Sequence, residues 1–191
     1  MRPILSALAL ALVAAPAGAE DPGSTAPKVE IVTNHGSLVL ELDPVNAPVT
    51  TENFLRYVRD GHYDGLIFHR VIAGFMAQGG GYDAEFAERE PREPIQNESR
   101  NGLSNERGTI AMARTSDPHS ATAQFFINLV DNHRLDGAAG RWGYTVFGRL
   151  IDGQDVLDKI GALPTGRGGP FPTDVPVRPV VIEKARVLEG E

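Results

Sequence analysis

The sequence predicts a mainly β protein, folded as an antiparallel barrel or sandwich. Seven or eight short strand-like segments follow one another, separated by turns rich in Gly and Pro. Only two segments have the apolar spacing of an amphipathic helix, so helices do not alternate with strands as they do around parallel sheets. With 191 residues, of which 41% are hydrophobic, the chain is long enough for one domain with its own core.

The first predicted elements are a β-hairpin and a helix. Alternating leucines in 37–42 indicate a half-buried strand, and a turn containing Gly joins it to a first strand at 29–33. Pro48 suits the first turn of a helix, and Gly61 suits the position just past its end. A short amphipathic helix is therefore expected at about 48–60.

The rest of the chain predicts further strands and a second helix. Apolar or alternating segments indicate strands at 66–72, 75–78, 109–113, 124–130 and 144–150. Helical spacing places the second helix at 154–160, and 180–188 closes the chain as a strand. Between these elements, 82–107 is polar and irregular, and the Gly- and Pro-rich stretch 161–179 is expected to be a long loop.

Residues 1–19 follow the pattern of a cleaved secretory signal peptide. A basic start and an apolar run precede the small residues 17–19, which fit a cleavage site. The apolar run is shorter than the roughly 20 residues that a membrane-spanning helix needs, so a membrane anchor is disfavoured. We expect cleavage before Glu20, a flexible arm at 20–27 and a folded domain at 28–189.

The charge balance and the lack of cysteine narrow the function classes. A net charge of −7 argues against nucleic acid as the partner, because phosphate backbones are bound by basic surfaces. The sequence contains no Cys, which excludes disulfides and an acylated cysteine anchor in an exported chain. Together with the signal pattern, this favours a periplasmic protein with no membrane attachment after signal cleavage.

Four blocks of sequence resemble the cyclophilin-type peptidyl-prolyl cis-trans isomerases, especially the bacterial periplasmic members. The blocks are FHRVIAGFMAQGG, RGTIAMAR, AQFFINL and YTVFGRLIDGQDVLDKI, and their order and spacing match over about 29–188. The resemblance implies a closed eight-stranded antiparallel barrel capped by two short helices, with no cofactor and no metal. The expected partners are proline-containing polypeptides, unfolded or extended, and the expected state is a monomer.

Arg70 is the candidate catalytic residue. An X-Pro bond isomerises slowly because resonance gives its C–N bond double-bond character. A fixed donor aimed at the prolyl nitrogen would bind the twisted amide, whose nitrogen regains a lone pair, better than the planar amide. From strand context alone, a surface ion pair would be the ordinary role of Arg70, but the resemblance places Arg70 at the family's catalytic arginine.

The resemblance places further site residues around Arg70. Phe75 and Gln78 join it as catalytic residues, and Gln78 would bond the substrate backbone and hold Arg70 in place. The substrate-binding residues would be Met76, Ala113, Arg114, Gln124, Phe126, Arg134, Leu135 and Tyr144. The apolar members would surround the proline ring, although each taken singly suits a core position equally well.

Three positions call for separate comment. Arg134 stands where animal relatives carry a Trp at the pocket edge, and Tyr144 stands where they often carry His. Because the family's cyclic peptide inhibitor contacts that Trp, weak binding of cyclosporin-type inhibitors is expected. His69 is expected on the strand face opposite Arg70, packed and hydrogen-bonded.

Three other functions compete with this interpretation. A chaperone or adaptor could hold proline-containing chains in the same groove without turnover. A hydrolytic site would draw on Ser116, Asp117, His119 and Ser120, but one short loop seldom has triad geometry and no nucleophile elbow is present. A metal site would draw on His62, Asp64 and His69, whose spacing matches no familiar ligand pattern.

Overall fold

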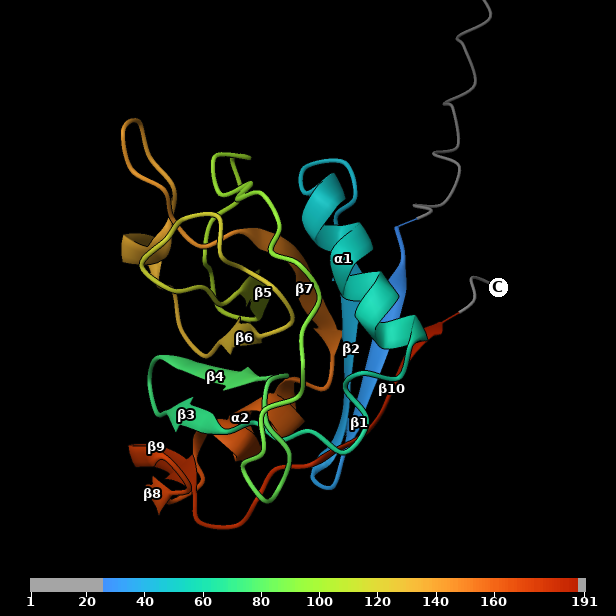
Figure 1. Ribbon diagram of the computed structural model, residues 1–191, viewed down its shortest axis with the longest axis vertical. Coiled ribbons are helices and arrows are strands. Elements are labelled where there is room, and N and C mark those ends of the chain that lie inside the picture. The colour runs from blue at the N-terminus through green and yellow to red at the C-terminus, as the bar shows by residue number, and fades with distance from the viewer. Residues whose placement is uncertain (1–25, 189–191) are drawn as a thin grey trace, which may run out of the picture.

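The computed structural model describes residues 26–188, which form one eight-stranded antiparallel sheet, one two-stranded sheet and two α-helices (Figure 1). The large sheet has the order β10-β1-β2-β7-β5-β6-β4-β3. Its strands are β1 (Lys28–Thr33), β2 (Gly36–Leu42), β3 (Arg70–Ile72), β4 (Met76–Gly79), β5 (Thr109–Met112), β6 (Phe125–Asn128), β7 (Val146–Asp152) and β10 (Ile182–Leu188). The other elements are α1 (Pro48–Arg59), α2 (Gln154–Gly161), the 3-10 helix η1 (His133–Leu135) and the hairpin β8 (Thr165–Gly168) and β9 (Phe171–Pro176).

The large sheet closes into a barrel through a short bridge. Just before β3 and β10, which are the two end strands of the sheet order, the Phe68 amide donates to the Val180 carbonyl at 2.9 Å. The Ile182 amide donates to the Leu66 carbonyl at 2.8 Å. The predicted eight-stranded barrel with two helices is therefore confirmed, and its closure is shorter than the pairing between its other neighbouring strands.

An aromatic cluster forms the centre of the core. Phe54 of α1 lies 5.2 Å from the Tyr63 ring, 5.6 Å from the Phe125 ring and 5.2 Å from the Phe147 ring, measured between centroids. All four side chains are fully buried. Burying such a side chain contributes roughly 1.5–3 kcal/mol, so this cluster fixes α1 to the barrel.

Strands β4, β5 and β6 bury apolar side chains on both faces. Ala77 and Ile127, which are paired across β4 and β6, belong to the main core. Since side chains alternate along a strand, their neighbours Met76 and Phe126 point to the other face, where they form a second cluster with Ala111 and Val146. This second face carries the candidate site.

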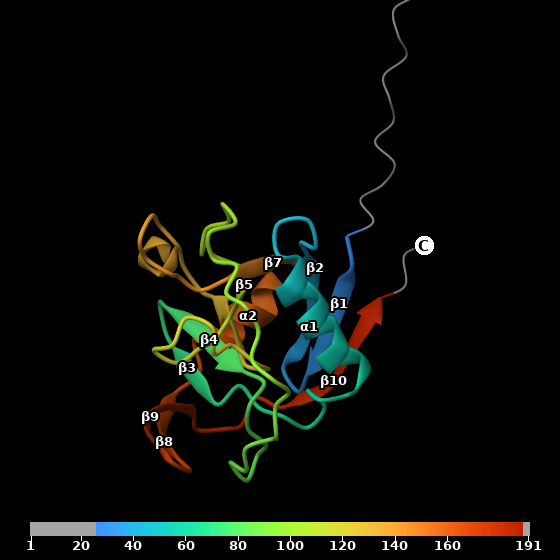
Figure 2. The same cartoon turned by 45° about the horizontal axis from the view of Figure 1, so that its top comes forward.

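The expected long loop at 161–179 is wrong, because the stretch contains the β8–β9 hairpin. In Figures 1 and 2 the hairpin lies beside β3, and β9 packs against that strand. The hairpin buries only Val175 and Pro176, so its sequence lacks the alternation that reveals a strand.

The remaining boundaries agree with expectation to differing degrees. Both helices lie within one residue of their predicted ends. The strand expected at 66–72 is regular only from Arg70, where β3 begins. The signal peptide and most of the arm at 20–27 lie outside the described residues, but the arm's last residue, Pro27, accepts a hydrogen bond from the Leu42 amide at 2.9 Å.

Candidate active site

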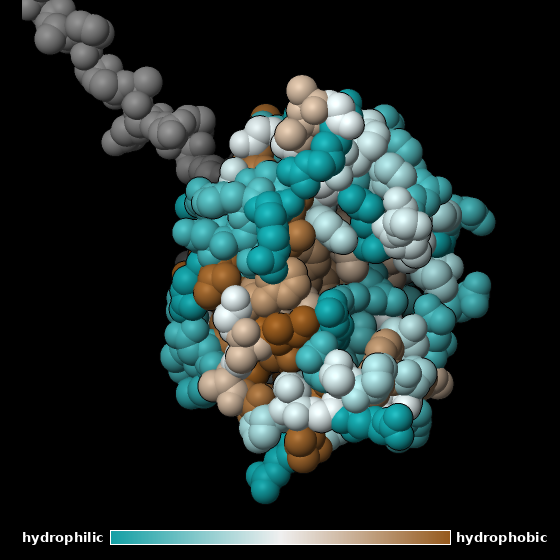
Figure 3. All heavy atoms as spheres, turned by 90° about the vertical axis from the view of Figure 1, so that its left-hand side faces the viewer, coloured by the Kyte–Doolittle hydropathy of each residue, from teal (hydrophilic) through white to brown (hydrophobic). Residues whose placement is uncertain are grey.

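A cavity of about 450 Å³ opens on the face that carries β3, β4 and β9. Figure 3 shows apolar side chains gathered in a hollow on this side of the molecule, bordered by polar ones. The cavity is lined by His69, Arg70, Phe75, Met76, Gln78, Tyr82, Ala113, Arg114, Gln124, Phe126, Leu135, Tyr144 and Phe171. Ten of the eleven predicted site residues are among them, and Arg134 is the exception.

Strand register brings the central residues together. Arg70 is paired with Gln78 across β3 and β4, and Gln78 is paired with Phe126 across β4 and β6. Residues opposite one another in neighbouring strands share a face, so these three side chains stand in one row. Short strands of three and four residues thus suffice to place a cation, an amide and an aromatic ring side by side.

The two glutamines bond to each other. Gln78 Nε2 donates to Gln124 Oε1 at 3.0 Å. A Cβ atom at Gly81 would lie only 2.5 Å from Gln124 Nε2, so glycine at that position leaves room for the Gln124 side chain. The structure therefore pairs Gln78 with Gln124. No hydrogen bond joins Gln78 to Arg70 in residues 26–188, and a role for Gln78 in holding Arg70 stays a prediction.

Asp174 on β9 is the carboxylate that faces Arg70. Asp174 Oδ2 lies 3.6 Å from Arg70 Nε, and the two side chains are 33% and 42% exposed. Solvent screens a pair so exposed, which therefore contributes little to stability. The contact is at Nε. The terminal N–H groups of the Arg70 guanidinium make no hydrogen bond within the described part of the chain.

The backbone of Asp174 is unusual. Its φ of 68° lies in the left-handed region, and only one other non-glycine residue of the described chain, Phe86, shares this property. Such a conformation costs roughly 1 kcal/mol in a residue with a side chain. Asp174 sits where the pairing of β8 with β9 shifts register, which is typical of a β-bulge that re-aims a side chain.

His69, Tyr82 and Phe171 complete the wall next to Arg70. Phe171 of β9 stacks on His69 with 5.3 Å between centroids and meets the edge of Tyr82 at 5.1 Å. Burial, followed by the charge of Arg70, lowers the pKa of His69 from 6.5 to about 4. His69 is packed as expected, but within the described chain its Nδ1 has no hydrogen-bond partner, and the residue contributes to the same cavity as Arg70.

Sequence reasoning did not identify Tyr82, Phe171 or Asp174 as site residues. Tyr82 begins a polar stretch, and the other two lie in the stretch expected to be a loop. The available signal was an aromatic residue between the two prolines of a Gly-rich segment, Pro170 and Pro172, because exposed loops seldom carry a large ring without a packing partner.

The floor of the cavity is apolar. Met76 and Phe126 are 3% and 4% exposed, and the Phe126 ring meets the Tyr144 ring edge-on at 5.6 Å. Phe75 and Leu135 pack against this pair. Together these side chains can hold a small apolar ring.

Two predicted substrate-binding residues, Arg114 and Arg134, lie at the wall opposite Arg70 and contact residues that line it. Arg114 donates to the carbonyls of Gly143, Trp142 and Thr115 at 3.0, 3.1 and 2.8 Å. Its side chain therefore braces the cavity wall next to Ala113. Arg134 does not line the cavity, but its guanidinium carbon lies 4.6 Å from the centroid of the Phe75 ring.

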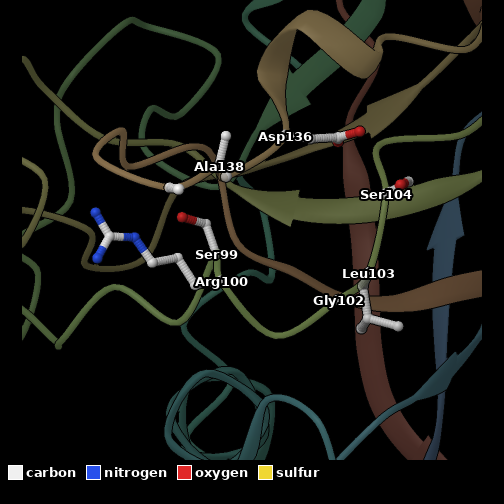
Figure 4. A pocket seen from close by; sticks show the side chains of 9 residues that line it. Ser99, Arg100, Gly102, Leu103, Ser104, Asp136 and Ala138 are labelled. Atoms are coloured by element: carbon white, nitrogen blue, oxygen red, sulfur yellow. The ribbon is translucent and has the colours of Figure 1, made fainter.

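A second cavity, of about 400 Å³, shares no lining residue with the first. Figure 4 shows Ser104 and Asp136 on one side of it, with the Arg100 side chain extending in the other direction. Small residues make up much of its lining, which combines Ser99, Arg100, Gly102, Leu103, Ser104, Asp136, Gly137, Ala138 and Ala139.

The competing hydrolytic site is not assembled. His119 Nδ1 accepts a hydrogen bond from the backbone N–H of Asn97 at 3.1 Å. Ser120 Oγ donates to the Asp117 carbonyl and accepts from Thr115, so no serine reaches the histidine in the described chain. This arrangement is a capped turn and lacks triad geometry.

The competing metal site and a membrane-spanning helix also lack support in residues 26–188. No group of three or more His, Cys, Asp or Glu side chains there could hold a metal ion. Asp64 instead accepts hydrogen bonds from Lys184 Nζ and the Ala185 amide. The same residues include no helix long and apolar enough to cross a membrane.

Comparison with known proteins adds a family and relatives. Residues 28–187 match the family described as cyclophilin type peptidyl-prolyl cis-trans isomerase/CLD. The chain is 56% identical to peptidyl-prolyl cis-trans isomerase cyp18 of Streptomyces antibioticus, covering 84% of this chain and 98% of that protein. It is 52% identical to peptidyl-prolyl cis-trans isomerase B of Escherichia coli K12, covering 82% and 97%.

Solved structures of cyclophilin type isomerases have a similar fold. A crystal structure of a Cryptosporidium parvum cyclophilin type peptidyl-prolyl cis-trans isomerase matches with a TM-score of 0.71 and 28% identity, covering 87% of this chain and 99% of that one. A second structure of that protein, in the presence of the dipeptide Ala-Pro, matches with a TM-score of 0.70 and 28% identity, covering 85% and 99%.

Proposed function

The chain belongs to the cyclophilin-type peptidyl-prolyl cis-trans isomerases, and we propose that it accelerates isomerisation of X-Pro bonds in extended polypeptides. One observation carries this proposal: Arg70, with its terminal N–H groups unbonded within the described chain, stands beside an apolar floor in one cavity. The relative solved with Ala-Pro supports a proline-containing peptide as the substrate.

The chemistry needs no covalent intermediate. Rotation about the C–N bond breaks amide resonance, and the prolyl nitrogen of the twisted amide becomes a hydrogen-bond acceptor. A donor placed at that nitrogen is used only in the twisted state, so it lowers the barrier without tightening ground-state binding. Each 1.4 kcal/mol of such preference is about a tenfold gain in rate.

Each part of the cavity has a role in this scheme. Met76, Phe126 and Leu135 would hold the proline ring fixed while the chain on its N-terminal side rotates. Arg70 would donate to the prolyl nitrogen through its terminal N–H groups. Gln78, held by Gln124, would bond the substrate backbone.

Asp174 would act as a positioning residue for Arg70. A carboxylate near Nε restricts the guanidinium without occupying its terminal N–H groups. The strained backbone of Asp174 supports this role, since such strain is often found at functional sites.

A binding module that holds proline-containing chains without turnover is the second candidate. Cis and trans populations of a short X-Pro peptide, followed by a protease-coupled assay, separate the two. The proposal predicts that catalytic amounts of the protein speed the interconversion. Saturable peptide binding with an unchanged interconversion rate would instead establish the binding module.

We also propose that the enzyme acts on proteins exported to the periplasm. The support is the signal-peptide pattern of residues 1–19. Cell fractionation followed by mass spectrometry of the purified protein tests it. A periplasmic product that begins at Glu20 is expected, whereas a cytoplasmic product that still begins at Met1 or Arg2 would contradict it.

A further inference from the structure

The arginines of this acidic protein fall into two groups, those that lie close to a carboxylate and those that do not. Among those away from the cavity, six lie within 4.0 Å of a carboxylate oxygen, namely Arg56, Arg59, Arg92, Arg107, Arg149 and Arg186. Four others, Arg100, Arg114, Arg134 and Arg141, have no carboxylate within that distance in the described chain, and all four contact the cavity wall or the loop beside it. We call these four the arginine wall.

Aromatic rings hold three members of the arginine wall. The guanidinium carbon of Arg134 lies 4.6 Å from the Phe75 centroid, and that of Arg114 lies 4.6 Å from the Tyr144 centroid. Both rings line the cavity. Arg100 lies 4.0 Å from the centroid of Trp142, whose carbonyl accepts a hydrogen bond from Arg114.

Arg141 fixes the loop that joins these residues. It donates to the carbonyl of Arg134 at 2.9 Å and to that of Asp136 at 2.8 Å. Stacking uses the flat face of a guanidinium and leaves its N–H edge available. The guanidinium groups of Arg100 and Arg134 donate no hydrogen bond within the described chain, so their edges are free to meet a ligand.

The nearby acids Asp136 and Asp117 form no ion pair with the arginine wall. The Asp136 carboxylate, 20% exposed, accepts from the backbone and side-chain nitrogens of Asn105 at 2.7 and 2.9 Å. Asp117 accepts from the His119 amide at 2.9 Å. Lack of an acidic partner is not itself unusual, since Arg89, Arg167 and Arg178 also have none within 4.0 Å. The distinctive feature is that four such arginines gather beside one cavity, where Arg114 is a lining residue and Arg134 covers the lining residue Phe75.

We propose that the arginine wall selects proline segments that carry Asp or Glu close to the proline. This inference rests on the proposed function, because it concerns the substrate of the same cavity. A protein with a net charge of −7 would otherwise repel an acidic chain. A concentrated positive wall reverses the local potential and favours acidic peptides at low ionic strength.

The test compares matched peptides that differ only in having Glu, Gln or Lys beside the X-Pro pair, on either side. At low ionic strength we expect kcat/KM for the better Glu peptide to exceed that for its Lys counterpart roughly five- to twentyfold. Raising the salt to about 0.5 M should reduce the ratio to about twofold or less. Equal values for Glu and Lys peptides at low salt would overturn the proposal.

Two variants locate the source of the preference. Arg134→Gln and, separately, Arg100→Gln should each lower the Glu/Lys ratio by about threefold or more. The matched control is Arg56→Gln, which removes the same charge from α1 and should keep the ratio. A ratio retained in both wall variants would overturn the assignment to the arginine wall. The ratio is internal to each variant, so a general loss of activity does not affect it.

Failure of the proposed function would give a different pattern. If the protein turns over none of the peptides, the proposed isomerase function is wrong. The preference for Glu over Lys is then tested by the dissociation constants of the same peptides. The same roughly five- to twentyfold order of Glu over Lys is then expected in binding. Equal dissociation constants would overturn the inference.

Discussion

Arg70 Nε lies 3.6 Å from Asp174 Oδ2, which joins the short strand β3 to a hairpin more than a hundred residues later in the chain. The hairpin presents this carboxylate from a backbone with a φ of 68°. β3 has three residues and could not by itself hold a long side chain in one direction. The hairpin therefore supplies a wall of the cavity as well as a partner for its cation.

Asp174→Asn tests the positioning role. The substitution removes the negative charge and keeps the size, so Arg70 should stay in place but sample more orientations. We expect kcat to fall by about three- to tenfold while KM changes by about twofold or less, because the interaction is needed mainly in the twisted state. Glu183→Gln in β10, where the side chain is exposed, is the matched control and should change neither constant. If instead KM rises by about three- to tenfold and kcat does not fall, Asp174 acts only in substrate binding.

Asp174→Gly separates stability from function. Glycine adopts a φ of 68° without strain, so the free energy of unfolding should rise by about 0.5–1 kcal/mol. The rate constant kcat should nevertheless fall as it does in Asp174→Asn. Chemical denaturation and the isomerisation assay together measure this, and a less stable protein with full activity would contradict the account.

His69 predicts a loss of stability in acid. Its pKa is about 4 in the folded protein and near 6.5 when unfolded, because burial disfavours the charged ring. Below about pH 6.5 the unfolded state binds the extra proton, so stability that is complete above this pH is lost down to about pH 4, by at most about 3 kcal/mol. The free energy of unfolding at several pH values measures the loss.

His69→Phe is the comparison for that experiment. Phenylalanine can occupy the space between Tyr82 and Phe171 and does not titrate. The pH dependence of the variant should be flatter between pH 6.5 and 4, although His62, whose pKa burial also lowers, will leave some slope. Parallel curves for the two proteins would show that His69 is not the responsible group.

Arg134 predicts weak binding of cyclosporin-type inhibitors. The charged side chain covers the Phe75 ring at the edge of the cavity, where a Trp would offer a large apolar surface. Arg134→Trp should tighten inhibitor binding by about tenfold or more, since a buried Trp contact is among the strongest in interfaces. An inhibition titration measures this, and tight nanomolar binding by the unmodified protein would contradict the prediction.

The apolar floor and its cation could be predicted from the sequence because they come from contiguous, strongly patterned blocks. Phe75, Met76 and Gln78 lie within a few residues of one another, and Phe126 occupies the strand paired with theirs. The hairpin could not be predicted in the same way. It contributes the Phe171 ring and the Asp174 carboxylate, which reach His69 and Arg70 only because β9 packs against β3.

His69 shows where strand alternation stops being a guide. Residue 69 precedes the first regular residue of β3, so its side chain need not alternate strictly with that of Arg70. The Phe171 ring stacks on His69, and both side chains line the cavity. A local pattern cannot reveal a partner that a distant segment supplies.

The central claim is that Arg70 stabilises the twisted prolyl amide more than the planar one. NMR exchange measurements on a short X-Pro peptide give the catalysed interconversion rate and the dissociation constant for the native protein and for Arg70→Ala. The account predicts that the interconversion rate falls by about a hundredfold or more while the dissociation constant changes by about threefold or less. An Arg70→Ala protein that is folded and interconverts the peptide at the native rate would contradict it.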